Sequence, residues 1–201
     1  LAAARPDLVL FGGDFVGTDA HAIGELAPLL GEVPAPLGRY AVLGNHDWWT
    51  DAAIVAGGLE AAGVTLLLNR SVRLPAPFED VVVCGLDDPW AGHPDPVRAF
   101  AGAEGIRIVL MHQPSGLLDI GDRPFAVAMC GHTHGGQIAL PGGIPVVVPH
   151  GRLSRRYARG RYALEGGRVL IVSRGIGCST LPFRMFAPPE VVVCDLELGR
   201  P

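Results

Sequence analysis

Four short apolar runs, each followed directly by a residue able to bind a metal, constrain the fold of this chain more than any other feature. All four runs are of the buried-strand type. They are residues 7–11 before Gly12-Gly13-Asp14, 40–43 before Gly44-Asn45-His46-Asp47, 106–111 before His112, and 124–129 before Cys130-Gly131-His132-Thr133-His134. In open α/β sheets, loops that follow different strands build sites at the carboxyl edge of the sheet. We therefore expect these polar residues to meet at one edge.

The stretch Gly131-His132-Thr133-His134-Gly135 is the most distinctive of the four. Side chains two residues apart in a strand share a face, and glycines free the backbone on both sides, so both imidazoles can point into one pocket. A turn with two surface histidines is the alternative interpretation. Asp14 could likewise cap a helix, Asn45 could form a turn, and His112 could be a core histidine. The repetition at four strand ends favours a metal site over these alternatives.

The order of the motifs resembles that of the calcineurin-like metallophosphoesterase superfamily. Its blocks are Asp-x-His, Gly-Asp, Gly-Asn-His-Asp/Glu, a lone His and Gly-His-x-His, and the last four occur here in that order. A narrower similarity, at residues 173–178 and 188–191, indicates the bacterial subgroup of YaeI/YkuE-like phosphodiesterases. Residues in these stretches are also similar to UDP-2,3-diacylglucosamine pyrophosphate hydrolases. The resemblance covers essentially the whole chain.

The first block of the superfamily is not found ahead of Asp14, where the family carries it. The chain opens instead with residues 1–7, which resemble the end of the helix that follows that block. We expect residues 1–201 to be a single metallophosphoesterase domain that is truncated at its N-terminus and lacks its first strand. A damaged gene copy is the alternative.

Hydrophobic periodicity by itself predicts an α/β fold with an antiparallel tail. The resemblance implies an αββα sandwich of two mixed β-sheets flanked by helices. The expected helices are residues 20–30, 51–62 with Asp51 as cap, and 96–103. The further expected strands are residues 64–68, 71–74, 81–84, 137–140, 146–148, 161–164, 168–173 and 190–198.

The resemblance also implies the metal ligands. Asp14 would bridge two divalent ions, with Asn45, His112 and His132 on one ion and His134 on the other. Mixed nitrogen and oxygen ligands suit Mn, Fe, Zn or Co. Two such ions would bind the phosphoryl oxygens and a bridging hydroxide that acts as the nucleophile. Because the first block supplies two ligands to the ion of His134, we expect this chain to hold one ion well and the second weakly.

By the same resemblance, His46 contacts the phosphate and protonates the leaving oxygen as general acid, and Asp47 holds its tautomer. A loop-stabilising His46 is the alternative. The candidate substrate-binding residues are Trp48, which follows the site and could equally belong to the core, and Arg174 and Arg184, which could bind phosphate or form salt bridges.

These residues predict a metal-dependent phosphodiesterase or pyrophosphate hydrolase acting on a nucleotide- or lipid-linked phosphate ester. Two alternatives stay open: a catalytically impaired fragment of such an enzyme, and a metal-binding module without hydrolytic activity. The intact Gly44-Asn45-His46-Asp47 block argues against the last, because metal storage does not require His46 outside the ligand set.

Composition and charge narrow the possible classes of function and location. The net charge of −4 gives no basic footprint for nucleic acid, and every apolar run stops well short of the ~20 residues that span a bilayer. The four cysteines have no zinc-site spacing, and we expect free buried thiols, with a disulfide between two adjacent strands as the alternative. A cytoplasmic or peripheral membrane location is expected, although an export signal could lie in the missing N-terminus. The sequence does not indicate an oligomeric state.

Overall fold

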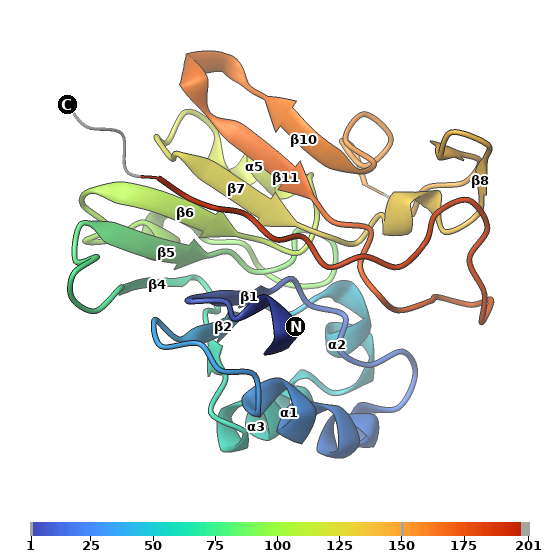
Figure 1. Ribbon diagram of the computed structural model, residues 1–201, viewed down its shortest axis with the longest axis horizontal. Coiled ribbons are helices and arrows are strands. Elements are labelled where there is room, and N and C mark those ends of the chain that lie inside the picture. Colours follow the sequence, from blue (N-terminus) through green and yellow to red (C-terminus); the bar gives the residue numbers. More distant parts are fainter. Residues whose placement is uncertain (1, 150, 198–201) are drawn as a thin grey trace.

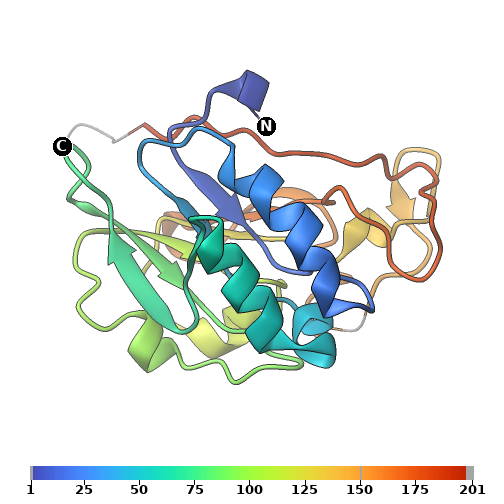
Figure 2. The ribbon, with the colours of Figure 1, turned by 90° about the horizontal axis from the view of Figure 1, so that it is seen from below.

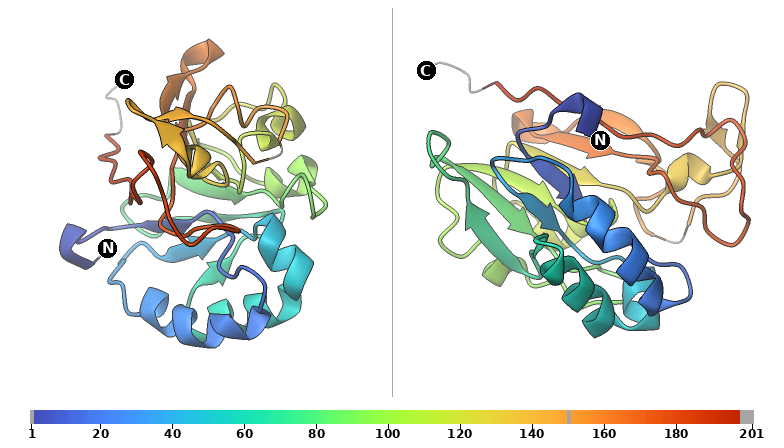
Figure 3. Two further views of the ribbon diagram at one scale, coloured as in Figure 1. Left: turned by 90° about the vertical axis from the view of Figure 1, so that its right-hand side faces the viewer. Right: turned by 60° about the horizontal axis from the view of Figure 1, so that its bottom comes forward.

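The computed structural model describes residues 2–149 and 151–197 (Figure 1). Two sheets lie face to face and helices cover their outer faces, as the side view in Figure 3 shows. This arrangement confirms the expected α/β sandwich. Within the described residues, the smaller sheet is entirely parallel and only the larger one is mixed.

The smaller sheet contains β1 (Val9–Phe11), β2 (Arg39–Ala41) and β3 (Thr65–Leu66) in that order. A 3-10 turn, η2 (Ala20–Ala22), leads into α1 (Ile23–Gly31), and α2 (Asn45–Thr50) leads into α3 (Ala52–Ala61). Figure 2 shows α1 and α3 packed side by side over this sheet. The Asp51 carboxylate accepts hydrogen bonds from the N–H groups of Ala53 and Ile54, which confirms it as the cap of α3.

The larger sheet has four central parallel strands and an antiparallel strand at each edge. Its order is β10 (Gly160–Ala163), β11 (Val169–Val172), β7 (Val127–Cys130), β6 (Ile106–Leu110), β5 (Val81–Gly85) and β4 (Arg70–Arg73). The strands predicted at 71–74, 81–84, 161–164 and 168–173 form the antiparallel pairs at the two edges. Two short helices, α4 (Pro96–Ala99) and α5 (Gly116–Ile120), contribute to the apolar cluster on the outer face.

Three apolar clusters correspond to the layers. The cluster between the sheets includes Val42, Leu67, Val83 and Leu110, all with 1% or less of their surface exposed. A second cluster lies between the small sheet and α1 and α3, and a third lies outside the large sheet. Burial on both faces explains why the central strands read as continuous apolar runs. The loops that follow β1, β2, β6 and β7 all start from this shared core.

Several sequence predictions fail in the second half of the chain. Residues 146–148 form no strand, and a short hairpin of β8 (Ala139–Leu140) and β9 (Ile144–Pro145) takes their place. Residues 190–197 form no ladder, because no described strand pairs with them, and residue 198 lies outside the described residues. The predicted helix 96–103 ends at Ala99, and α5 was not predicted. The remaining short elements are η1 (Ala2–Ala4), η3 (His134–Gly136) and η4 (Glu165–Gly167).

None of the helices in residues 2–149 and 151–197 is both long and apolar enough to cross a bilayer. The four cysteines are free, as expected, but only Cys84 and Cys130 are buried, and Cys178 and Cys194 are exposed.

Candidate metal centre

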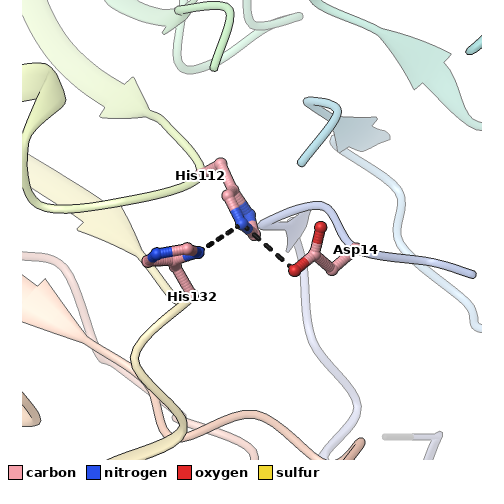
Figure 4. Close-up of side chains that lie close together, drawn as sticks. All are labelled: Asp14, His112 and His132. Atoms are coloured by element: carbon pink, nitrogen blue, oxygen red, sulfur yellow. Dashed lines mark hydrogen bonds and ion pairs between the residues drawn. The ribbon is translucent and has the colours of Figure 1, made fainter. Parts of the chain in front are cut away.

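Side chains from four strand ends converge on Nε2 of His112. The Asp14 carboxylate after β1 lies 3.3 Å from this nitrogen, Asn45 Oδ1 at the start of α2 lies 3.1 Å away, and His132 Nδ1 after β7 lies 3.0 Å away. Figure 4 shows Asp14, His112 and His132 pointing toward one another. Among the described residues, these three form the one group of His, Cys, Asp and Glu side chains with the spacing to hold a metal ion.

The tautomer of His112 is set by the loop after β1. Nδ1 lies 2.6 Å from the carbonyl oxygen of Gly12, which can only accept, so Nδ1 carries the proton and donates it. Nε2 is thereby directed at Asp14, Asn45 and His132. Such a contact from the second nitrogen is typical of metal-binding histidines.

The charges of Asp14 and His112 stabilise each other. Burial alone would lower the pKa of His112, but the Asp14 carboxylate raises it to about 9, with smaller contributions from Asp88 and the Gly12 carbonyl. Burial likewise tends to raise the pKa of Asp14, yet His112 and the backbone N–H of His46 lower it to about 2. Without a metal, the site therefore holds an ionised carboxylate beside a protonated imidazole.

The backbone around the site is strained at three residues, and the sequence gives no direct sign of this strain. Asp14, His132 and His134 have positive φ angles of 57°, 67° and 53°. Non-glycine residues in this region are uncommon and cluster at functional sites. Gly44 is needed for close approach, because a Cβ there would collide with the Asp14 carboxylate and the His112 ring.

Asn45, His46 and Asp47 lie in the first turn of α2, not in the loop that the sequence suggested. The resemblance assigned Asp47 to orient His46, but the structure gives its carboxylate different partners. Oδ2 accepts from the N–H groups of Asp14 and Gly44, each at 2.9 Å, and Oδ1 accepts from Phe15 and Val16. Asp47 therefore joins the loops after β1 and β2. Burial and the nearby Asp14 charge raise the pKa of Asp47 to about 6.

His46 is oriented by Gly17 instead. Its Nδ1 donates to the Gly17 carbonyl oxygen at 3.0 Å, and its Nε2 lies 3.4 Å from the Ser179 hydroxyl. The backbone N–H of His46 donates to Asp14, so His46 adjoins the metal-binding group without belonging to it.

His134 lies outside the group around His112. Its Nδ1 donates to Gln137 Oε1 at 2.9 Å, an assignment fixed because the Gln137 amide nitrogen donates to the carbonyls of Ser179 and Leu181. Burial lowers the pKa of His134, and the Gln137 contact opposes that effect. Sequence analysis did not identify Gln137. Gln137 lies three residues after His134, and this spacing is the feature of the sequence that could have pointed to the contact.

The three predicted substrate-binding residues are already engaged. Trp48 Nε1 donates to Asp87 Oδ1 at 2.9 Å, and its ring packs on the helical side of the small sheet. Arg174 forms an ion pair with Glu190, and Arg184 donates to the backbone carbonyls of Arg174, Gly177, Ala187 and His134. These contacts hold loops of the chain together, and a role of the three residues in substrate binding stays a prediction.

Two other tryptophans lie beside the metal-binding group. Trp49 packs edge-on against His46, with ring centroids 5.2 Å apart, and against Trp90 at 4.7 Å. Trp90 in turn packs against His132 at 6.0 Å. Both tryptophans are about half exposed, at 53% and 43%. The sequence placed Trp49 beside the site but gave no means of choosing it over Trp48.

The triplet Asp19-Ala20-His21 fits the pattern Asp-x-His literally but follows Asp14 in the chain. The Asp19 carboxylate accepts from the N–H of His21 and caps η2, and both side chains are exposed. It is a helix cap and takes no part in the metal-binding group.

Comparison with known proteins assigns the chain to a family. The family model for calcineurin-like phosphoesterases matches residues 1–136, which include all the residues around His112. The chain belongs to the calcineurin-like phosphoesterase family. This phosphoesterase is therefore a hydrolase of phosphoric esters, and the similarity found in the sequence is confirmed.

Similar proteins support this family assignment. It is 33% identical to the uncharacterized metallophosphoesterase YkuE of Bacillus subtilis and 32% identical to phosphodiesterase YaeI of Escherichia coli. These matches cover 96% of this chain and 69% and 71% of the relatives. UDP-2,3-diacylglucosamine pyrophosphatase LpxG of Chlamydia muridarum is 28% identical, over 96% of this chain and 74% of its own length. No solved structure matches significantly.

Proposed function

We propose that this phosphoesterase cleaves phosphodiester or pyrophosphate bonds with the help of a divalent metal ion bound by Asp14, Asn45, His112 and His132. One observation carries the proposal: three donor atoms lie 3.0–3.3 Å from Nε2 of His112. Ligands about 2.1 Å from a common ion are themselves separated by roughly 3.0–3.4 Å. The group already has the spacing of a coordination shell.

The donor set is two imidazoles, one carboxylate and one amide oxygen, which suits Mn, Fe, Zn or Co. A bound ion of this kind polarises a phosphoryl oxygen and lowers the pKa of water. The chain's own residues fix the geometry: Gly12 holds the His112 ring, and the His46 N–H holds one oxygen of Asp14 while the other faces His112.

We assign His134 to a second ion, with Asp14 as the shared ligand. The contact with Gln137 leaves Nε2 of His134 as the nitrogen available for binding. Since the described residues provide a set of three or more converging ligands only around His112, the proposed order of affinity is one tight ion and one weak ion.

His46 is the proposed proton donor to the leaving oxygen. Gly17 occupies Nδ1, so a protonated His46 presents Nε2–H toward the side of the site where Ser179 lies. General acids work best when a second contact fixes the ring. Asp47 acts as a positioning residue in this proposal, because it binds the backbone on both sides of the Asp14 loop.

The proposed substrates are nucleotide- or lipid-linked phosphate esters. The printed names of YaeI and LpxG, a phosphodiesterase and a pyrophosphatase of an acylated sugar nucleotide, support this class. Trp49 and Trp90 are the proposed contacts for the organic part of the substrate, since exposed tryptophans bind both bases and apolar groups.

The first test is hydrolysis of bis(p-nitrophenyl) phosphate with added Mn, together with measurement of bound metal. We expect metal-dependent turnover in the unchanged chain and in His21→Ala, whose side chain is exposed and does not belong to the ligand group. We expect His112→Ala to lose both metal and turnover. If the unchanged chain binds metal tightly but shows no turnover above the level of His112→Ala, it is a metal-binding module without hydrolytic function.

A further inference from the structure

One end of the molecule exposes a group of large apolar side chains. They come from the β8–β9 hairpin with the residues after it, and from the segment 181–186. These segments lie together at the right-hand end in Figure 1 and in the right view of Figure 3. Each exposes between 43% and 66% of its surface. We call this group the apolar end surface: Leu140, Ile144, Val146, Val147, Leu181, Phe183, Met185 and Phe186.

The two segments are fastened together. The N–H of Met185 donates to the Gln137 carbonyl at 2.9 Å, and the N–H of Ala139 donates to the Met185 carbonyl at 2.8 Å. Leu140 and Ile144 are direct partners across the hairpin, so their side chains lie next to each other. Backbone hydrogen bonds therefore hold these apolar side chains at the surface. Exposed apolar patches of this kind mark interaction sites.

Arginines border the apolar end surface. Residues 123–190 contain nine arginines and two acidic residues, although the whole chain has a net charge of −4. Arg155, Arg156 and Arg159 line a hollow together with Ile144 and Pro145. One of the two acidic residues, Glu190, also lines this hollow and is paired with Arg174. Arg155 and Arg156 are exposed, and Arg159 is anchored on the Gly142 carbonyl at 2.7 Å. Positive charge and apolar surface thus meet at the hairpin.

We propose that this end of the molecule docks on a bilayer that contains anionic phospholipids. The arginines fit lipid phosphates, and the apolar side chains fit the acyl boundary beneath them. The phosphates of a nucleic acid would pair with the arginines equally well. It would leave the aliphatic side chains Leu140, Ile144, Val146 and Val147 in water, because they do not stack on bases as aromatic residues do.

The docking surface adjoins the metal centre. Gln137 donates to the carbonyls of Ser179 and Leu181 while its Oε1 holds the ring of His134. Ser179 is also the residue next to Nε2 of His46. Docking would therefore bring the centre to the level of lipid headgroups. The inference extends the proposed function, since it identifies where a lipid-linked phosphate ester would be presented.

The test is co-sedimentation of the whole chain with phosphatidylcholine vesicles, with and without phosphatidylglycerol. We expect binding to the anionic vesicles only, weakened by high salt. Ile144→Asp with Val147→Asp should abolish it. Arg155→Glu with Arg156→Glu should weaken it by at least about fivefold per arginine. The matched controls, Val97→Asp on α4 and Arg73→Glu on β4, are exposed in other elements and should bind normally.

Several outcomes would overturn the proposal. These are no binding to anionic vesicles, binding that the Arg155/Arg156 variant leaves unchanged, and a dimer that the same variants dissociate. Displacement of vesicles by DNA with equal loss of both in the arginine variant would instead assign the surface to nucleic acid. Hydrolysis of the soluble ester bis(p-nitrophenyl) phosphate should be unaffected by the surface variants, so failure of docking and failure of the proposed hydrolysis are separate results.

Discussion

The Nδ1 of His112 donates a hydrogen bond to the carbonyl oxygen of Gly12, a residue one hundred positions earlier in the chain. The contact joins the ends of β6 and β1 and determines which nitrogen of His112 faces the other ligands. It also helps to set the protonation of the site before a metal ion binds. With the Asp14 carboxylate adjacent, the pKa of His112 is raised to about 9 while that of Asp14 is about 2.

Metal binding should therefore release about one proton at pH 7. Nε2 of His112 must lose its proton to bind an ion, whereas Asp14 is already ionised. The affinity for Mn should rise by up to about tenfold per pH unit until pH 9. Calorimetric titration in two buffers of different ionisation enthalpy measures the release directly, with His21→Ala as a control. Heats that are identical in both buffers would show that the empty site holds no such proton.

Asp47→Asn should lower the stability of the fold by about 2–4 kcal/mol. The carboxylate accepts four backbone N–H groups, and an amide would turn its own NH₂ group toward two of them. Because the folded pKa is raised to about 6, above the usual 3.8, ionisation of Asp47 lowers stability as the pH rises from about 4 to 6. Urea unfolding at pH 8, where Asp47 of the unchanged chain is ionised, compares the stability of that chain with the stability of Asp47→Asn.

Asp51→Asn is the matched control for this substitution, since asparagine caps helices as well as aspartate does. Its effect should stay within about 0.5 kcal/mol. An equal loss of stability in both variants would mean that the four contacts of Asp47 contribute nothing beyond a helix cap.

The positions of the candidate ligands were predictable, and their supporting contacts were not. A buried strand that ends at a polar residue, with or without an intervening glycine, is a local pattern. It marked Asp14, Asn45, His112 and His132 as candidates. The contact of Gly12 with His112 joins distant segments, so no local pattern contains it. The valines of residues 191–193 predict a strand by composition, but strand formation requires a partner, which the described residues do not supply.

The two tryptophans of this stretch differ for a simple geometric reason. Sequence alone does not show whether residues 45–50 form a loop or a helix, so it does not distinguish the directions of Trp48 and Trp49. In helix α2, adjacent side chains point about 100° apart, so Trp48 turns toward the core and Trp49 toward His46. Identifying the helix would have required the Gly44 N-cap contact with Asp47, three residues later.

His46→Ala should slow hydrolysis without reducing bound metal, because His46 lies outside the ligand group. A general acid contributes roughly 10²–10⁴-fold. The loss should be small for p-nitrophenyl esters, whose leaving group needs no proton, and large for alkyl esters. His93→Ala is the control, since the contacts of His93 are made by its backbone. Equal losses for both kinds of ester would exclude proton donation by His46.

Trp49→Ala and Trp90→Ala should raise KM for esters with aromatic or long apolar groups and leave kcat nearly unchanged. The two rings pack at 4.7 Å and connect His46 to His132, so they border the site. Stacking on an exposed ring contributes about 1–3 kcal/mol, which corresponds to roughly 5- to 150-fold in KM. Trp49→Phe should retain most of this stacking contribution.

Trp48→Phe is the control, because it removes the hydrogen bond to Asp87 and should lower the stability of the fold instead of raising KM. If KM for aromatic esters is the same in Trp49→Ala and the unchanged chain, the organic part of the substrate binds elsewhere.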